Sequence, residues 1–126
     1  MIHKVKQNIQ FWNDMTKGLK PFEIRKNDRP YAVGDLLELK AVGECCNYCD
    51  GISYKCYYNG ICKGWQNCYE DEAETFTSII TEVIKPEDYN TSSQDPKINK
   101  VLKDFFNSDY LMEDYVILMT ASLPKL

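Results

Sequence analysis

Residues 18–35 read GLKPFEIRKNDRPYAVGD, and this stretch decides how the rest of the sequence is interpreted. Its residues 22–25, FEIR, alternate apolar and polar side chains, which is the pattern of a half-buried strand. The following KNDRP predicts a turn, because Asn and Asp bond to the nearby backbone and Pro fixes its own φ. Gly18 predicts the end of a preceding helix. The stretch therefore predicts a helix end, a strand and a turn in succession.

The flanking sequence extends this order into an α+β fold. Periodic apolar residues and β-branched runs predict strands at residues 2–6, 22–25, 36–42, 76–84 and 115–122. Helical spacing of apolar residues predicts helices at residues 8–17 and 97–107, and residues 86–96 read as a polar loop. An order of strand, helix, several strands, helix and strand favours a small, mostly antiparallel β-barrel that carries two helices.

Length and charge narrow the expected partners. The 126 residues suit one domain spanning residues 1–126. No apolar run is long enough to span a bilayer, and the N-terminus has no apolar signal-peptide core, so we expect a cytoplasmic protein without a membrane partner. The chain has a net charge of −4, yet residues 1–29 hold seven Lys and Arg against three Asp and Glu. This local excess favours a small or single-stranded anionic ligand, unless it is a chance cluster of solvated side chains.

The basic strand and turn supply the candidate ligand-binding residues. Glu23 and Arg25 share one face of the predicted strand, so the acid can fix the Arg rotamer and leave donors for a phosphate, a carbonyl or a base edge. Lys20 precedes the strand and can reach the same side, while Lys26 and Arg29 add cations at the turn. The alternative is a surface ion pair with solvated neighbours, which contributes little to stability.

These residues resemble the DUF3850 family of the ASCH/PUA-like superfamily. The ASCH pattern is similar to G-x-K-x-x-E-x-R, here residues 18–25, and DUF3850 members continue with K-N-D-R and V-G-D, here residues 26–29 and 33–35. They also open with a segment similar to His3–Lys6, so the resemblance is dense over residues 3–40. It implies a PUA-like barrel with a cleft lined by Lys20, Glu23 and Arg25, and an association with RNA.

The same superfamily includes amidohydrolases that act on acetylated cytidine. These enzymes resemble G-x-K-x-x-T, with the Lys and the Thr in catalytic roles. Gly18 and Lys20 fit this pattern, but Glu23 stands where the Thr would be. If chemistry occurs, Lys20 and Glu23 are the candidate catalytic residues, and Lys20 then needs a lowered pKa. The alternative is that Glu23 only positions Arg25.

All six cysteines lie between residues 45 and 68, within an expected insertion at about residues 44–74. The spacing of Cys46 and Cys49 predicts one knuckle of a structural zinc site. The candidate ligands are Cys46, Cys49, Cys62 and Cys68, with Cys56 or Cys45 as substitutes. Disulfides and free thiols remain the other interpretations, although clustered cysteines in a cytosolic chain favour a metal.

Three functions remain open from the sequence. The first is a module that binds RNA or a modified nucleoside through Lys20, Glu23, Arg25, Lys26 and Arg29. The second is a small amidohydrolase that acts on N-acylated cytidine-type substrates. The third is a phage or mobile-element accessory protein that binds a protein partner through its Cys-rich insertion. The sequence predicts no cofactor besides the structural zinc ion.

Overall fold

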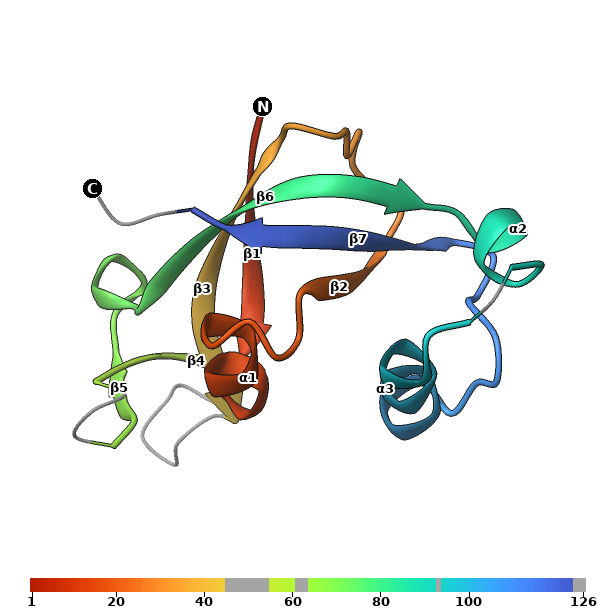
Figure 1. Cartoon of the computed structure of the whole chain (residues 1–126). Helices are drawn as coiled ribbons and strands as arrows, with labels where there is room; N and C mark the ends of the chain where they lie inside the picture. The colour runs from red at the N-terminus through yellow and green to blue at the C-terminus, as the bar shows by residue number, and fades with distance from the viewer. Residues whose placement is uncertain (45–54, 61–63, 93, 124–126) are drawn as a thin grey trace.

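The fold is seen in a computed structural model that describes residues 1–44, 55–60, 64–92 and 94–123 (Figure 1). The strands are β1 (Ile2–Asn8), β2 (Phe22–Lys26), β3 (Leu36–Glu44), β4 (Lys55–Asn59), β5 (Gln66–Cys68), β6 (Thr75–Ile84) and β7 (Tyr115–Ser122). The helices are α1 (Trp12–Thr16), α2 (Pro86–Tyr89) and α3 (Pro96–Phe106), with 3₁₀ turns η1 (Ile9–Phe11) and η3 (Glu70–Glu72). The α+β class and most predicted elements are therefore confirmed.

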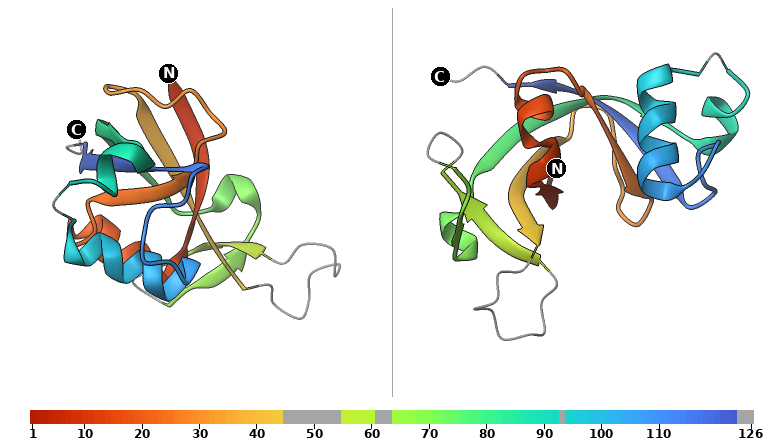
Figure 2. Two further views of the ribbon diagram at one scale, coloured as in Figure 1. Left: turned by 90° about the vertical axis from the view of Figure 1, so that its right-hand side faces the viewer. Right: turned by 90° about the horizontal axis from the view of Figure 1, so that it is seen from below.

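The strands form one curved sheet of seven members in the order β2-β7-β6-β3-β4-β5, with β1 beside β3 (Figure 2). The β1–β3 pair is parallel and every other described pair is antiparallel. Among the described strands, β2 pairs with β7 alone and β1 with β3 alone, so the expected closed barrel is wrong. A side chain joins β2 to β1, because Arg25 Nη2 of β2 donates a hydrogen bond to Lys6 O of β1 at 2.7 Å. We call this contact the β1–β2 seam.

Two apolar clusters form the core of the described fold. One packs α1 against the middle strands and includes Trp12, Leu37 and Leu39. The other packs α3 against β2 and β7 and includes Phe22, Leu102 and Ile117, which are all at most 3% exposed. Burial of a side chain of this size contributes roughly 1.5–3 kcal/mol. Figures 1 and 2 show the β4–β5 hairpin at one end of the sheet and α3 at the other.

Two segments differ from the sequence prediction. Residues 86–96, expected as a loop, begin with the short helix α2, which starts at Pro86 and has two acids in its first turn. Pro suits the first helical position and acids there complement the helix dipole. Tyr89 at its end is buried, and its hydroxyl donates to Asn99 Oδ1 at 2.6 Å. Local helix-start signals and a tertiary contact through Tyr89 therefore both support this helix.

The Cys-rich segment also contains structure that the sequence did not predict. Strands β4 and β5 pair antiparallel, with Tyr57 opposite Cys68, and the η3 turn follows them. The sequences of β4 (KCYYN) and β5 (QNC) do not alternate apolar and polar side chains, so they lack the pattern that predicted β2.

Candidate functional site

A polar cavity of about 280 Å³ lies between β1, β2 and α3. It is lined by residues of β2 that belong to the motif at residues 18–25, and by aromatic rings of α3 and η1. The lining residues are Lys6, Gln7, Asn8, Gln10, Phe11, Lys20, Glu23, Ile24, Arg25, Val101, Phe105 and Phe106. The predicted residues Lys20, Glu23 and Arg25 thus meet in one concave space.

Lys20 is delivered to the cavity by the turn after α1. Gly18 adopts a left-handed φ of 75°, and the backbone N–H groups of Leu19 and Lys20 donate to Asp14 O at 2.8 and 3.1 Å. The Lys20 ammonium donates to Phe22 O at 3.2 Å and lies 5.1 Å from the centre of the Phe11 ring. These contacts hold the ammonium at the cavity between a backbone carbonyl and the rings of Phe11 and Phe22.

Burial is the largest influence on the charge of Lys20. Desolvation lowers the pKa of its amine, and the nearby positive charge of Arg25 lowers it as well. The carboxylates of Glu23 and Asp14 act in the opposite direction, since they favour the protonated form. The net pKa lies below the ordinary value of a lysine.

Glu23 stands between two cations at the base of the cavity. Its Oε2 lies 3.5 Å from Arg25 Nη2 and 3.9 Å from Lys20 Nζ, and the residue is only 3% exposed. The same Arg25 nitrogen donates to Lys6 O, so the guanidinium is fixed across the seam between β1 and β2. The expectation that Glu23 fixes the rotamer of Arg25 agrees with this arrangement.

Three buried polar atoms around the cavity have no hydrogen-bond partner among the described residues. They are Gln7 Nε2, Glu23 Oε1 and Arg25 Nε. A fourth such atom, Ser78 Oγ, belongs to β6 and does not line the cavity. Buried polar atoms are nearly always paired in folded proteins, because each one left unpaired costs about 1–3 kcal/mol. The three atoms around this space are therefore candidates for hydrogen bonds to a ligand or to ordered water.

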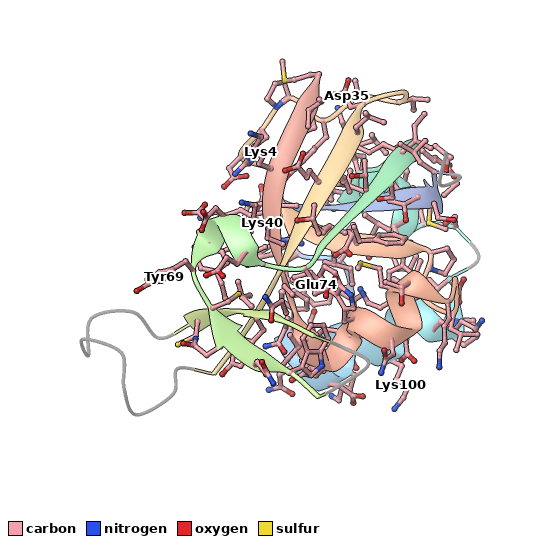
Figure 3. The ribbon with its side chains drawn as sticks, turned by 90° about the vertical axis from the view of Figure 1, so that its left-hand side faces the viewer. Lys4, Asp35, Lys40, Tyr69, Glu74 and Lys100 are labelled. Atoms are coloured by element: carbon pink, nitrogen blue, oxygen red, sulfur yellow. The ribbon has the colours of Figure 1, made fainter. Side chains whose placement is uncertain are left out.

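A second hollow, of about 290 Å³, shares the lining residues Lys6 and Arg25 with the polar cavity. We call it the basic groove; it is lined by Lys4, Val5, Lys6, Arg25, Lys26, Asp28, Arg29 and Tyr31. Figure 3 shows Lys4 extending from β1 on the side away from β3. The structure thus places Lys26 and Arg29, predicted as partners of Lys20 and Glu23, in this separate groove. Only Arg25 among the predicted residues lines both hollows.

Several lining residues were not found by sequence reasoning. Gln7 and Lys6 come from β1, while Phe105 and Phe106 come from α3, about a hundred residues later in the chain. The sequence places Phe105 and Phe106 on an apolar helix face, and nothing local marks Gln7 as a site residue. Tertiary packing alone brings these segments together, through an edge contact of 4.6 Å between the ring centres of Phe11 and Phe105.

Two of the motif residues, His3 and Asp35, have a structural role. His3 is buried, and its Nε2 lies 2.8 Å from Asp35 Oδ2, which also accepts from the Ala32 N–H. Figure 3 shows Asp35 at the start of β3, beside the beginning of β1. Hydrogen bonds to His3 and the N-terminal amine lower the pKa of Asp35. The His3–Asp35 pair therefore ties β1 to β3 and lies apart from the cavity.

The predicted zinc site falls mostly outside the described residues, which leave out Cys45, Cys46, Cys49 and Cys62. Among residues that the structure describes, no group of three potential ligands is placed to hold a metal. Because Cys68 lies opposite Tyr57, Cys56 and Cys68 point to opposite faces of the β4–β5 hairpin. These two cysteines are thus poor partners in one site. Zinc stays a prediction, which elemental analysis checks by finding about one zinc per chain.

Comparison with known proteins places the chain in a family. None of the described helices is long and apolar enough to cross a membrane. No curated protein matches the chain. A family model with the description "Domain of unknown function (DUF3850)" matches residues 2–65, half of the 126 residues, and this range contains β1, α1, β2 and β3. The chain therefore belongs to the DUF3850 family.

Proposed function

We propose that the chain binds the base of a nucleoside or of single-stranded RNA in the polar cavity between β1, β2 and α3. The observation that carries this proposal is the group of three buried, unpaired polar atoms that surround one cavity with aromatic walls. Unstacked RNA bases are commonly recognised by hydrogen bonds to their edges and by stacking on aromatic side chains. Phe11 and Phe105 supply the aromatic surface.

The unpaired atoms favour a pyrimidine. Glu23 Oε1 is an acceptor, whereas Gln7 Nε2 and Arg25 Nε are donors. A complementary edge has one donor group and two acceptors, which is the pattern of both cytosine and uracil. The pairing edge of guanine has two donor groups and one acceptor and fits less well. The cavity volume of about 280 Å³ suits such a small ligand, since pockets for drug-sized molecules span about 300–1,000 Å³.

A PUA-like placement of the fold is part of the same proposal. It is supported by the curved, mostly antiparallel sheet and by the seam at which β1 and β2 are joined through Arg25 and Lys6. An experimental structure with ligand tests the placement. We expect the β1–β2 seam to persist and the sheet to wrap around the same core, whereas a wide separation of these strands would contradict it.

Binding of short RNA tests the proposed function. Homopolymers of about eight nucleotides suit one small domain, and fluorescence anisotropy measures their affinity. We expect pyrimidine oligomers to bind more tightly than purine oligomers, and Glu23→Gln to weaken binding about tenfold through the loss of one charged acceptor. The control is Lys85→Gln, which changes one exposed charge outside both hollows. Equal binding by wild type and Glu23→Gln, or no binding by either, would contradict the proposal.

A second candidate is hydrolysis of an N-acylated cytidine. The lowered pKa of Lys20 favours it, because a lower pKa increases the neutral fraction of the amine, the form that can accept a proton from an attacking water. However, no Ser, Thr or Tyr is among the described residues that line the cavity. Incubation with acetylated cytidine distinguishes the two functions. Turnover that disappears in Lys20→Ala supports an enzyme, and binding without turnover supports the module.

The third hypothesis, a phage or mobile-element accessory protein with a partner at the Cys-rich insertion, stays a prediction. Residues 45–54 and 61–63 of that insertion lie outside the described part of the chain. Capture of a partner that is lost when residues 45–54 are replaced by a short linker would support it.

A further inference from the structure

We infer that the basic groove holds the phosphate of a nucleotide whose base occupies the polar cavity. This inference rests on the proposed function, and it narrows the ligand from a nucleoside to a phosphorylated nucleotide or a short single strand. The groove and the cavity share the lining residues Lys6 and Arg25, so one molecule can reach both hollows.

The charge of the groove points to an anion. Five cationic side chains and one acid line it, although the chain as a whole has a net charge of −4. No carboxylate of a described residue pairs with Lys4, Lys26 or Arg29, because all the ion pairs lie elsewhere. Clustered cations without counter-charges repel one another, and a phosphate brought among them removes this repulsion.

The groove also supplies directional donors. Arg25 is held in place by Glu23 and by Lys6 O, so its fork of N–H groups is oriented before a ligand arrives. Tyr31 forms part of the wall, and its ring packs 4.7 Å from that of buried His3. Burial raises the pKa of Tyr31, so its hydroxyl keeps its proton and can donate to a phosphate oxygen.

The fixed position of Arg25 links the two hollows. Its Nε, unpaired among the described residues, belongs to the polar set around the cavity, while its side chain also lines the groove. A base that bonds to this guanidinium therefore leaves its sugar and phosphate close to Lys26 and Arg29. The acidic remainder of the chain repels a long duplex, which favours a mononucleotide or a few linked nucleotides.

Calorimetric titration tests the inference with four probes: uridine, uridine 5′-monophosphate, uridine 3′-monophosphate and inorganic phosphate. We expect at least one monophosphate to bind about tenfold more tightly than uridine, because charged hydrogen bonds are added. The double variant Lys26→Gln/Arg29→Gln should lose this gain and keep the affinity for uridine. Both side chains are exposed and make no ion pair with a described residue, so the variant is expected to fold.

The matched control is Lys85→Gln/Lys97→Gln, which removes two exposed charges outside both hollows. It should retain the tighter binding of the monophosphate. Equal affinity for uridine and both monophosphates would overturn the phosphate inference and leave the base cavity intact. A different result would overturn both the proposed function and the inference of a shared ligand. In that result inorganic phosphate binds and its binding is lost in the groove variant, but uridine does not bind and no nucleotide binds more tightly than inorganic phosphate.

Discussion

The polar cavity and the basic groove share Lys6 and Arg25, yet they present opposite kinds of chemistry. Around the cavity, Glu23 is 3% exposed and Gln7 6% exposed, and each carries a buried polar atom with no hydrogen-bond partner among the described residues. In the groove, Lys4, Lys26 and Arg29 are exposed to water and make no ion pair with a described residue.

The difference indicates a division of tasks. Buried hydrogen bonds distinguish one base from another, because a mismatched edge leaves them unpaired at a cost of about 1–3 kcal/mol. Exposed cations attract any phosphate, and salt screens them over a distance of about 8–10 Å. We therefore expect base preference to depend on the cavity, and the salt dependence of affinity to depend on the groove.

Replacement of Arg25 should have the largest effect, because this residue belongs to both regions. In Arg25→Ala the hydrogen bond to Lys6 O is lost, and among the described residues Glu23 keeps only the more distant Lys20 as a counter-charge. We expect about a hundredfold weaker nucleotide binding and a loss of about 1–3 kcal/mol in the free energy of unfolding. Titration with nucleotide and urea unfolding measure these two effects.

Arg25→Lys is the informative control for that variant. It retains the charge near Glu23 but lacks the planar fork that bonds to Lys6 O and faces both hollows. We expect it to recover part of the stability and little of the binding. Full recovery of binding would show that charge alone matters, which would remove the distinction between the two regions.

Replacement of Gln7 separates stability from binding. Gln7→Leu removes a buried donor that has no partner among the described residues and keeps a similar side-chain volume. We expect the free protein to become more stable by about 1 kcal/mol, because an unpaired buried group is removed, while base binding weakens about tenfold. Thermal unfolding and RNA titration measure the two quantities.

The salt dependence of the same titrations sharpens the comparison. The slope of log affinity against log salt should stay unchanged in Gln7→Leu and decrease by about 0.7 in Lys26→Gln, the value expected for one phosphate contact to a single strand. A smaller slope in the cavity variant and an unchanged slope in the groove variant would reverse the assignment of the two regions.

The smallest predicted effect concerns the protonation of Lys20. Its pKa is lowered in the folded chain, so the unfolded chain binds a proton more tightly and the free energy of unfolding rises with pH between the folded pKa and 10.5. Glu23→Gln should lower the pKa of Lys20 further, because the carboxylate raises it, whereas Arg25→Gln should raise it. NMR titration of the lysine side chains measures both shifts, and Lys20→Met identifies the signal. Shifts of the same sign in both variants would contradict this account.

Much of the fold could be predicted from the sequence, because its periodic segments are long. The predicted strand at residues 115–122 coincides with β7, and the predicted helix at 97–107 coincides with α3 to within one residue at each end. The short helix α2 was missed because four residues are about one helical turn, and the β4–β5 hairpin was missed because its strands do not alternate apolar and polar residues.

The candidate site was predictable only where it is local in the sequence. Strand alternation correctly placed Glu23 and Arg25 together, but it does not separate the two hollows, because Arg25 lines both and Lys26 lines the groove. Gln7, Phe105 and Phe106 could not be predicted as site residues, because β1 and α3 meet β2 only through packing. Closure of the barrel was likewise wrong, since side chains replace backbone pairing at the β1–β2 seam.

The most direct test of the central claim follows the side-chain N–H signals of Gln7 and Arg25 by NMR as a pyrimidine nucleotide is added. The account predicts that the Gln7 Nε2 and Arg25 Nε signals shift and saturate together, because both atoms gain a partner in the cavity, while the signal of exposed Gln66 stays in place. A nucleotide that shifts groove residues or Gln66 and leaves the Gln7 and Arg25 signals unmoved would contradict it.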